Sequence, residues 1–250
     1  MSKKLINKFS NHQTRSILRL ELCLGVGFIL IFAAIAVAHY SLTDLDRQIE
    51  NWFSTSTTPT GHYIFNKITW LGQTIILVPI TFAIIFWQAL QKQWFMAIGL
   101  FISVILGGFL TFFFKLLFHT QHPGVSSFSF QYMDLGFPSG HAMISLLFFG
   151  FLGYTTLRNS KNFHQQMIIG ACTALIILSV GLSRLFLGVH FPTDVLGGWS
   201  LGAAWLMISI IMIELIEKRR YFLHKKNYEK PENTIKYVEK PGHDETSSII

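Results

Sequence analysis

Apolar residues are concentrated in six long stretches of the chain, which are separated by short polar segments. Each stretch approaches or exceeds the roughly 20 helical residues needed to cross a hydrocarbon core. The six predicted spans are Leu20–Ala38, Ile68–Leu90, Trp94–Phe118, His141–Leu157, Met167–Leu187 and Val195–Ile216. This pattern predicts an all-α fold, namely an integral membrane bundle of six transmembrane helices.

Composition leads to the same class of protein. The 250 residues are 51% hydrophobic, 15% aromatic and only 13% charged, whereas a soluble domain carries about 25% charged residues. One membrane domain is therefore expected over residues 20–216, between a basic N-terminal segment (1–19) and a polar tail (217–250). The tail contains Pro231 and Pro241 and is expected to be solvated or disordered. Cys23 and Cys172 fall inside apolar runs and are expected only to pack there.

The distribution of Lys and Arg predicts the orientation. With the N-terminus inside, only Arg47, Lys67, Lys115 and Arg184 of the 20 basic residues fall on the outer side. Cytoplasmic loops carry the excess of positive charge, so both termini are predicted to be cytoplasmic. The net charge of +7 comes from tails and loops that flank the spans, which is why we expect no nucleic-acid partner.

Two features near the N-terminus have alternative interpretations. The basic leader, the first apolar run and Ala36-Val37-Ala38 also fit a cleaved signal peptide, but the leader is long and the run approaches spanning length. The segment Leu42–Phe53 has apolar residues at helical spacing with acids and Arg47 between them. It predicts a short helix on the outer surface, either packed as a loop helix or admitting lipid.

Ionisable residues at membrane depth are costly and need a reason. The first cluster closes the third span and consists of Lys115, His119, His122 and Pro123. The three ionisable residues share one helix face if the helix continues that far. A lysine that extends its ammonium from a helix end to the interface is common, so this cluster alone favours a structural role.

The second cluster, Pro138-Ser139-Gly140-His141, opens the fourth span. Proline near a helix start, a hydroxyl and a glycine that allows close backbone approach are typical of an anion site at a helix N-terminus. The alternative is a plain N-cap by Ser139.

The third cluster runs from the fifth span into the sixth: Ser183-Arg184, then His190, then Asp194. A guanidinium suits phosphate oxygens. His190 and Asp194 are four residues apart, so the carboxylate can hold one imidazole nitrogen and leave the other free. This is the arrangement of a base or nucleophile with its orienting acid. The predicted topology places all three clusters at the outer side.

At these residues the chain resembles the type 2 phosphatidic acid phosphatase superfamily. The signature of that family is Lys-x6-Arg-Pro, then Pro-Ser-Gly-His, then Ser-Arg-x5-His-x3-Asp. The second motif is complete at 138–141 and the third is complete from Ser183 to Asp194. The first appears as Lys115-x6-His122-Pro123, with histidine in place of arginine.

The resemblance implies a catalytic role for three residues. His190 would attack phosphorus and form a phosphohistidine, Asp194 would orient it, and His141 would protonate the leaving group. The non-bridging oxygens would be held by Lys115, His122, Ser139, Gly140 and Arg184. The family needs no metal or other cofactor, and Asp194 is the only carboxylate in the three motifs, too few for a magnesium site. The implied substrate is a lipid phosphate or diphosphate, of the phosphatidic acid, phosphatidylglycerophosphate or undecaprenyl diphosphate type.

The histidine at position 122 leaves three interpretations open. An imidazole lacks the guanidinium fork and is not always charged. When protonated by bound phosphate it still donates a hydrogen bond, which is the interpretation we favour. Otherwise the pocket suits a different headgroup, such as a diphosphate, or activity is weakened or lost, since removing one such donor costs about 3–4 kcal/mol in the transition state.

Three other functions remain to be weighed. A zinc cluster would gather His119, His122, His141 and His190, although the intact motifs account better for the last two. A transporter would place its charged groups near the bilayer midplane rather than at one boundary. A lipid phosphotransferase of the same fold is compatible with a phosphohistidine. The favoured hypothesis is a multi-pass phosphatase of the cell membrane whose active site faces the periplasm or exterior.

Overall fold

The structure is a computed structural model that describes residues 13–123 and 135–228. The first twelve residues and the end of the tail, with Pro231 and Pro241, lie outside the described residues. Within the described ranges all regular structure is helical, apart from one isolated bridge between Gln121 and Leu135. The predicted all-α class is therefore confirmed.

The helices follow the predicted spans closely. Over the described ranges, six of them are long and apolar enough to cross a membrane. The first span is α2 (Gln13–Ser41), and the second runs from α4 (Pro59–Thr69) through η1 (Trp70–Gly72) into α5 (Thr74–Leu90). The third is α6 (Trp94–Leu100) continued by the π-helical η2 (Phe101–Leu106) and α7 (Gly107–Phe118). The last three are α8 (Gly140–Asn159), α9 (Phe163–Phe186) and α10 (Pro192–Tyr228).

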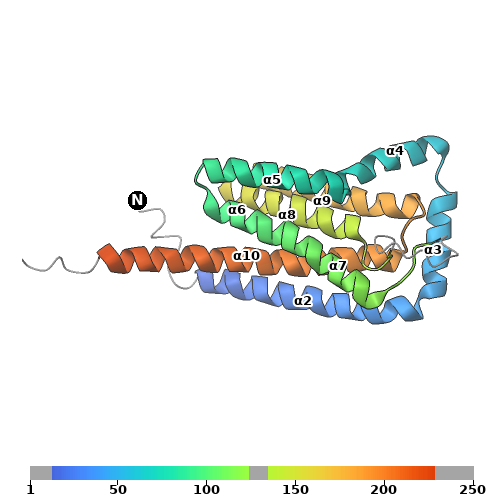
Figure 1. Cartoon of the computed structure of the whole chain (residues 1–250), viewed down its shortest axis with the longest axis horizontal. Coiled ribbons are helices and arrows are strands. Elements are labelled where there is room, and N and C mark those ends of the chain that lie inside the picture. The colour runs from blue at the N-terminus through green and yellow to red at the C-terminus, as the bar shows by residue number, and fades with distance from the viewer. Residues whose placement is uncertain (1–12, 124–134, 229–250) are drawn as a thin grey trace, which may run out of the picture.

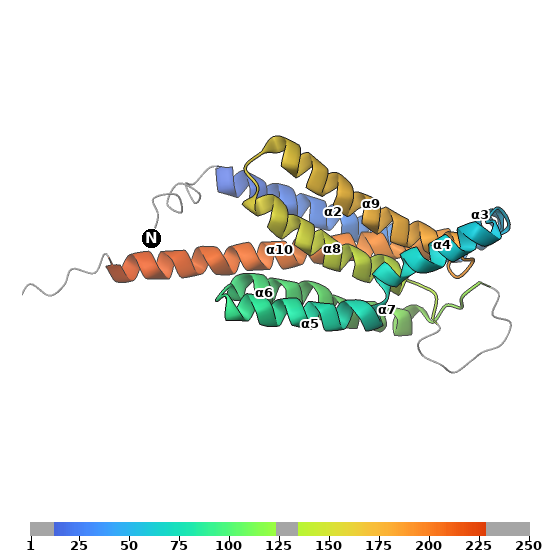
Figure 2. The same ribbon diagram turned by 90° about the horizontal axis from the view of Figure 1, so that it is seen from above.

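Helix α10 forms the axis of the bundle. It packs along α2 and against α8, which in turn packs against α9 (Figures 1 and 2). The core between them is apolar, with Leu100, Val104, Met143, Leu147 and Phe151 all fully buried. At most half of each span's most apolar stretch is buried inside the protein.

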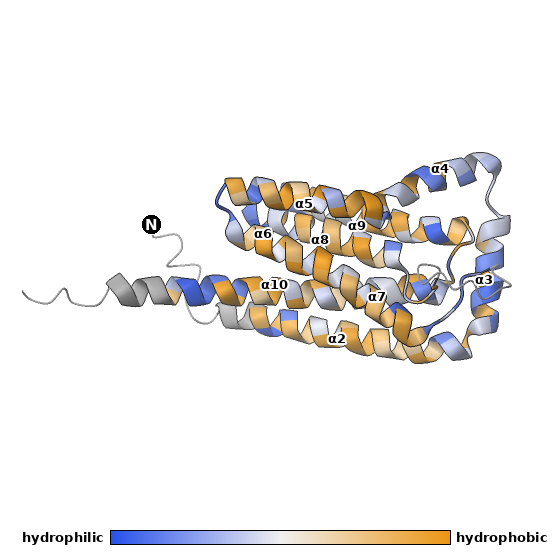
Figure 3. Ribbon diagram, in the orientation of Figure 1, coloured by the Kyte–Doolittle hydropathy of each residue, from blue (hydrophilic) through white to orange (hydrophobic). Residues whose placement is uncertain are grey.

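The outward faces of the spans are as apolar as the core. Figure 3 shows hydrophobic positions on the outside of α2, α5 and α7, and hydrophilic ones gathered on α3 and on the coloured part of α10 next to its grey end. Free Cys23 and Cys172 also lie exposed on the bundle's outer surface. Such faces are stable only where lipid replaces water.

The second span begins differently from the prediction. A break follows the predicted start at Ile68: α4 (Pro59–Thr69) ends there and a 3₁₀ turn, η1 (Trp70–Gly72), leads into α5. Thr58 caps α4 by accepting a hydrogen bond from the Gly61 amide at 3.1 Å. Gly72 is required at the turn because a Cβ there would lie 2.5 Å from Val180 Cγ1. The turn thereby packs tightly against α9.

The predicted surface helix at Leu42–Phe53 is confirmed as α3 (Thr43–Thr55). It runs across one end of the bundle, steeply inclined to the spans (Figure 1). Leu45 and Trp52 are 48% and 61% exposed, whereas Asp46 on the inner side is only 3% exposed. The helix therefore covers the bundle end with a buried carboxylate directed inward.

The last helix extends beyond the predicted span and into the predicted polar tail. Helix α10 does not end near Ile216 but continues to Tyr228. Two contacts stabilise the extension: Glu217 pairs with Arg158 of α8, and the Arg220 guanidinium lies 5.3 Å from the centre of the Phe95 ring. Residues such as Glu, Lys and Arg are good helix formers, so polarity alone did not end the helix.

Candidate active site

The three sequence clusters lie at one end of the bundle, the end that α3 crosses. Helices α7 and α9 finish there, and α8 and α10 begin there (Figures 1 and 2). The alternating direction of the spans therefore brings together residues that are up to 79 positions apart, from Lys115 to Asp194.

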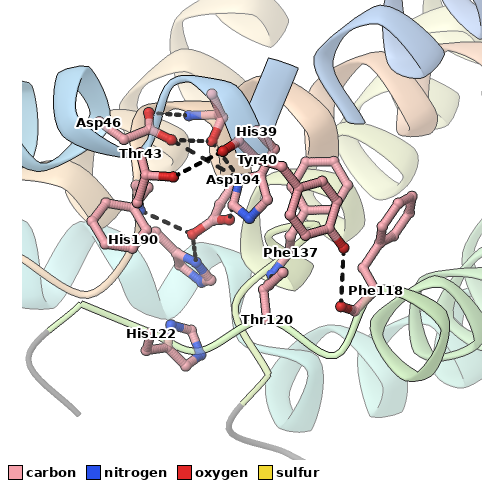
Figure 4. Close-up of polar contacts among 12 residues, drawn as sticks. His39, Tyr40, Thr43, Asp46, Phe118, Thr120, His122, Phe137, His190 and Asp194 are labelled. Carbon is pink, nitrogen blue, oxygen red and sulfur yellow. Dashed lines mark hydrogen bonds and ion pairs between the residues drawn. The ribbon is translucent and has the colours of Figure 1, made fainter. Parts of the chain in front are cut away.

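His190 and Asp194 form a buried pair at the start of α10. His190 Nδ1 lies 3.2 Å from Asp194 Oδ2, and the two residues are 2% and 0% exposed (Figure 4). The Phe191 amide also donates to Oδ2 at 2.9 Å. A carboxylate only accepts hydrogen bonds, so the proton is assigned to Nδ1. Nε2 of His190 is then left with its lone pair.

The surroundings of His190 favour its neutral form. Burial lowers the pKa of His190 well below its ordinary value of 6.5, and electrostatic interactions with His122, Lys115 and Arg184 lower it further. Desolvation and nearby cations both oppose protonation. A neutral imidazole with a free Nε2 is a competent nucleophile or base.

The Pro-Ser-Gly-His segment lies directly beside this pair. The Ser139 amide donates to the Asp194 carbonyl at 2.9 Å, and α8 begins at Gly140. Ser139 Oγ is completely buried, makes no cap hydrogen bond and has no hydrogen-bond partner within the described ranges. Ser139 therefore occupies the N-cap position without capping α8 through its side chain, and the hydroxyl remains available to a ligand.

Close helix packing makes this arrangement possible. A Cβ at Gly198 of α10 would lie 2.5 Å from the Ser139 carbonyl oxygen, so α10 approaches the start of α8 only because position 198 is glycine. On the other side, a Cβ at Gly140 would lie 3.7 Å from Lys115 Cε. The Lys115 side chain thus passes over the N-terminus of α8, where free amides favour an anion.

Arg184, at the end of α9, is held by a residue that the sequence analysis missed. Its Nη1 donates to Thr69 Oγ1 of α4 at 2.7 Å, and Thr69 is 3% exposed. The Nε atom of Arg184 is buried without a hydrogen-bond partner in the described part of the chain. Thr69 therefore orients the Arg184 guanidinium through Nη1 and leaves the Nε–H group able to donate to a ligand. No pattern in the sequence pointed to this threonine.

Lys115, His119 and His122 were expected to share a helix face only if the helix continued to His122, and this condition is not met. Helix α7 ends at Phe118, and His119 adopts a left-handed conformation with φ of 51°. His122 lies beyond the turn, where its ring centre is 4.4 Å from that of His190. Lys115 Nζ donates to the Leu135 carbonyl.

His122 is fixed by the backbone before His190. Its Nδ1 lies 2.6 Å from the Val189 carbonyl oxygen, which can only accept, so Nδ1 carries the proton. Burial lowers the pKa of His122, and Lys115 lowers it further. In the free protein its Nε2 is therefore an acceptor, and the negative charge of a bound phosphate would favour protonation of the ring.

Three further polar residues lie behind Asp194 and were not among the sequence candidates. His39, Asp46 and Thr193 are 9%, 3% and 6% exposed and contact one another. An ionisable histidine at the end of the first apolar run was a signal for this site. Asp46 gave no such signal, because it was one of several polar residues between the apolar positions of a surface helix.

Among the described residues, no group of three or more His, Cys, Asp and Glu side chains has a geometry that could hold a metal ion. The predicted zinc alternative thus lacks a ligand cluster within those residues. The available donors instead suit an anion: Ser139 Oγ, Arg184 Nε and the start of α8.

Comparison with known proteins identifies similar chains. Residues 96–217 match the model of the PAP2 superfamily. The chain is 36% identical over 96 residues to phosphatidylglycerophosphatase B of Bacillus subtilis, 38% over 85 residues to glucose-6-phosphatase 3 of Mus musculus, and 36% over 81 residues to undecaprenyl-diphosphatase of Sulfolobus acidocaldarius. In the same order, these matches cover 37%, 32% and 32% of this chain. They cover 44%, 25% and 34% of the three relatives, so the chain spans less than half the length of the curated relatives it matches.

The likeness to a solved structure is more extensive. A transmembrane PAP2-type phosphatidylglycerolphosphate phosphatase from Bacillus subtilis superposes with a TM-score of 0.67 at 25% identity. The superposition covers 77% of this chain and 96% of that one. The chain therefore shares its overall fold with that protein.

Proposed function

We propose that this chain, which belongs to the PAP2 superfamily, removes phosphate from the headgroup of a membrane lipid. The observation that carries the proposal is the buried His190–Asp194 pair at the end of a membrane bundle. Beside it, Ser139 Oγ and Arg184 Nε are buried polar atoms without partners among the described residues. A phosphate provides the missing acceptors for both donors.

In the proposed reaction, Nε2 of His190 attacks phosphorus in line with the leaving oxygen. The phosphorus–nitrogen bond forms as the phosphorus–oxygen bond to the lipid breaks, and His141 gives the departing alkoxide or phosphate a proton. Asp194 stabilises the positive imidazole ring that results. Water, deprotonated by His141, then attacks the phosphohistidine, releases inorganic phosphate and restores neutral His190.

The other motif residues stabilise charge in this scheme. Phosphoryl transfer depends mainly on positioning and on stabilisation of the equatorial oxygens. We assign that role to Lys115, His122, Ser139, the Gly140 amide and Arg184. The contact of His122 with His190 supports the interpretation that the imidazole replaces the arginine of the first motif as a donor.

The position of the site supports a lipid substrate. It lies at the end of six apolar spans, where a headgroup is held at the membrane surface while its chains stay in the hydrocarbon. Two relatives are named for the lipid phosphates phosphatidylglycerophosphate and undecaprenyl diphosphate. We therefore propose a phosphomonoester or diphosphate of this type, with phosphatidic acid as a further candidate.

We also propose that the site faces the periplasm or exterior of a cell membrane. The excess of Lys and Arg in the segments on the opposite side supports cytoplasmic termini. In this orientation residues 1–19 and the tail 217–250 lie in the cytoplasm, and α3 lies on the outer surface.

Hydrolysis by purified full-length protein tests the proposal. The wild-type chain is expected to release phosphate from at least one member of a panel of lipid phosphates, equally with and without chelator, and His190→Ala is expected to abolish turnover. His62→Ala is the matched control, since His62 is exposed on α4. Turnover by a folded His190→Ala variant at the wild-type rate would exclude His190 as the nucleophile. Formation of a phosphorylated alcohol instead of free phosphate would identify a phosphotransferase.

A further inference from the structure

A second set of polar contacts lies behind Asp194, on the side away from His190. It joins three helices. His39 comes from the end of α2 and Asp46 from α3 (Figure 4), and Thr193, in the first turn of α10, contacts both. His39 and Asp46 lie outside the three motifs, and Thr193 occupies a variable position of the third motif. Burying polar groups costs free energy unless they are paired. Three such groups in one place therefore indicate a role beyond packing.

Asp46 caps the N-terminus of α10 from outside that helix. Asp46 Oδ1 accepts from the Thr193 amide at 3.1 Å, and Asp46 Oδ2 accepts from the Thr193 hydroxyl. The first amides of a helix have no partner within it, and a negative charge there is favourable. Because Asp194 is the next residue, this cap fixes the turn of backbone that carries the catalytic carboxylate.

The direction of the hydrogen bonds links His39 to the same cap. A hydroxyl has one proton, and Thr193 donates it to Asp46 when that carboxylate is ionised. Thr193 Oγ1 must then accept from His39 Nδ1, which lies 2.7 Å away. The same nitrogen lies 3.9 Å from Asp194 Oδ1, the oxygen not used by His190, and Oδ1 has no hydrogen-bond partner within the described ranges.

Packing holds the His39 ring in this orientation. The ring of Phe137 lies 4.7 Å from it at an angle of 31°, and Phe137 is completely buried. Phe137 is itself fixed by its amide, which donates to Thr120 Oγ1 at 2.8 Å. His39 therefore contacts both the segment preceding Ser139 and the helix turn that carries Asp194.

We infer that Asp46, Thr193 and His39 are positioning residues for the reaction, which hold Asp194 between two imidazole rings so that its Oδ2 stays on His190. The inference rests on the proposed function. It assigns α3 a role in catalysis, because that surface helix supplies the carboxylate which caps the catalytic turn. A small displacement of such a group costs up to about 100-fold in rate.

Two substitutions at Thr193 separate positioning from packing. Thr193→Val keeps the shape and removes the hydroxyl, whereas Thr193→Ser keeps the hydroxyl. Thr193→Val is expected to lower kcat about 10- to 100-fold with KM within about twofold of wild type. Thr193→Ser should restore kcat to within about twofold. A Thr193→Val enzyme with wild-type kcat, or a loss that Thr193→Ser shares, would overturn the inference.

Asp46→Asn provides an independent variant of unchanged shape. Its amide group would donate to Thr193 Oγ1 and so reverse the hydrogen bond to His39. A fall in kcat of about tenfold is expected, while Asp44→Asn, at an exposed position of the same helix, should leave kcat unchanged. Equal kcat values for the two variants would contradict the inference.

Measuring wild type and His190→Ala in the same assay separates a failure of the proposed function from a failure of the positioning role. If the wild-type chain releases no phosphate from any lipid phosphate, the proposed function itself fails. If His190→Ala retains wild-type turnover, the proposed nucleophile fails. If His190→Ala is inactive while Thr193→Val and Asp46→Asn match wild type, only the positioning role fails. Melting temperatures in detergent, recorded for every variant, confirm that kcat is compared per folded molecule.

Discussion

The imidazole ring of His122 lies against that of His190, with ring centres 4.4 Å apart and planes inclined by 61°. The two residues are also joined through the backbone, since His122 Nδ1 donates to the carbonyl of Val189, the residue before His190. The substituted position of the first motif is thus part of the site and adjoins the proposed nucleophile.

Substitution of His122 measures what this ring contributes. His122→Ala is expected to lower kcat/KM about 10²- to 10³-fold, because one donor to the transition-state charge is removed. His122→Arg should preserve or raise activity, because arginine supplies a permanent charge at the position where the family motif has one. A collapse of activity in His122→Arg would mean that the pocket is shaped around the imidazole.

The acid limb of the pH profile reports the protonation of His190. A protonated imidazole has no lone pair for attack, so activity falls as the pH drops through the pKa of His190. Since burial and the neighbouring cations lower that pKa well below 6.5, kcat/KM should stay flat from neutral pH to below pH 6.5. Ionisation of the substrate, followed separately by ³¹P NMR, must be corrected for. A corrected midpoint at or above 6.5 would contradict a neutral, buried nucleophile.

Removal of the Thr69 hydroxyl tests how Arg184 is oriented. In Thr69→Val the Arg184 Nη1 loses the acceptor that it contacts at 2.7 Å, so the buried guanidinium is free to rotate away from phosphate. A hydrogen bond to a charged group contributes about 1.5–3 kcal/mol, which corresponds to a loss in kcat/KM of roughly 10- to 150-fold. Thr69→Ser keeps the hydroxyl and should stay close to wild type. Equal losses in both variants would indicate packing rather than orientation.

Labelling of single cysteines tests the orientation of the bundle. The background variant replaces the exposed Cys23 and Cys172 by alanine. Asn51→Cys places a thiol on α3, and Gln91→Cys places one in the turn between α5 and α6; both positions are exposed. A membrane-impermeant maleimide added to intact cells should modify only the cysteine at 51. Modification of the one at 91 alone would invert the proposed topology.

Much of the architecture could be predicted from the sequence because lipid imposes a simple rule. A backbone that crosses hydrocarbon must satisfy its own hydrogen bonds, so each long apolar run had to be a helix. Counting the spans then placed Lys115, Ser139, His190 and Asp194 at one end. The His190–Asp194 contact was predictable as well, since its two members lie within one helical turn of sequence.

Contacts between distant helices could not be predicted in the same way. His39 and Thr193 are 154 residues apart, and Thr69 and Arg184 are 115 apart. Whether such side chains meet depends on how the helices rotate and approach one another, which hydropathy does not specify. The end of α7 was missed for a related reason: the left-handed turn at His119 is a local backbone choice that the spacing of Lys115 and His122 does not reveal.

The most direct test of the account is the identity of the phosphorylated residue. Wild-type protein turning over a ³²P-labelled lipid phosphate is quenched in alkali within a single turnover, and its peptides are mapped by mass spectrometry. Attack by His190 predicts an acid-labile, alkali-stable phosphate on this residue that is absent from His190→Ala. Phosphate on a different residue, or release of product with no phosphate on His190 at any time in the turnover, would contradict it.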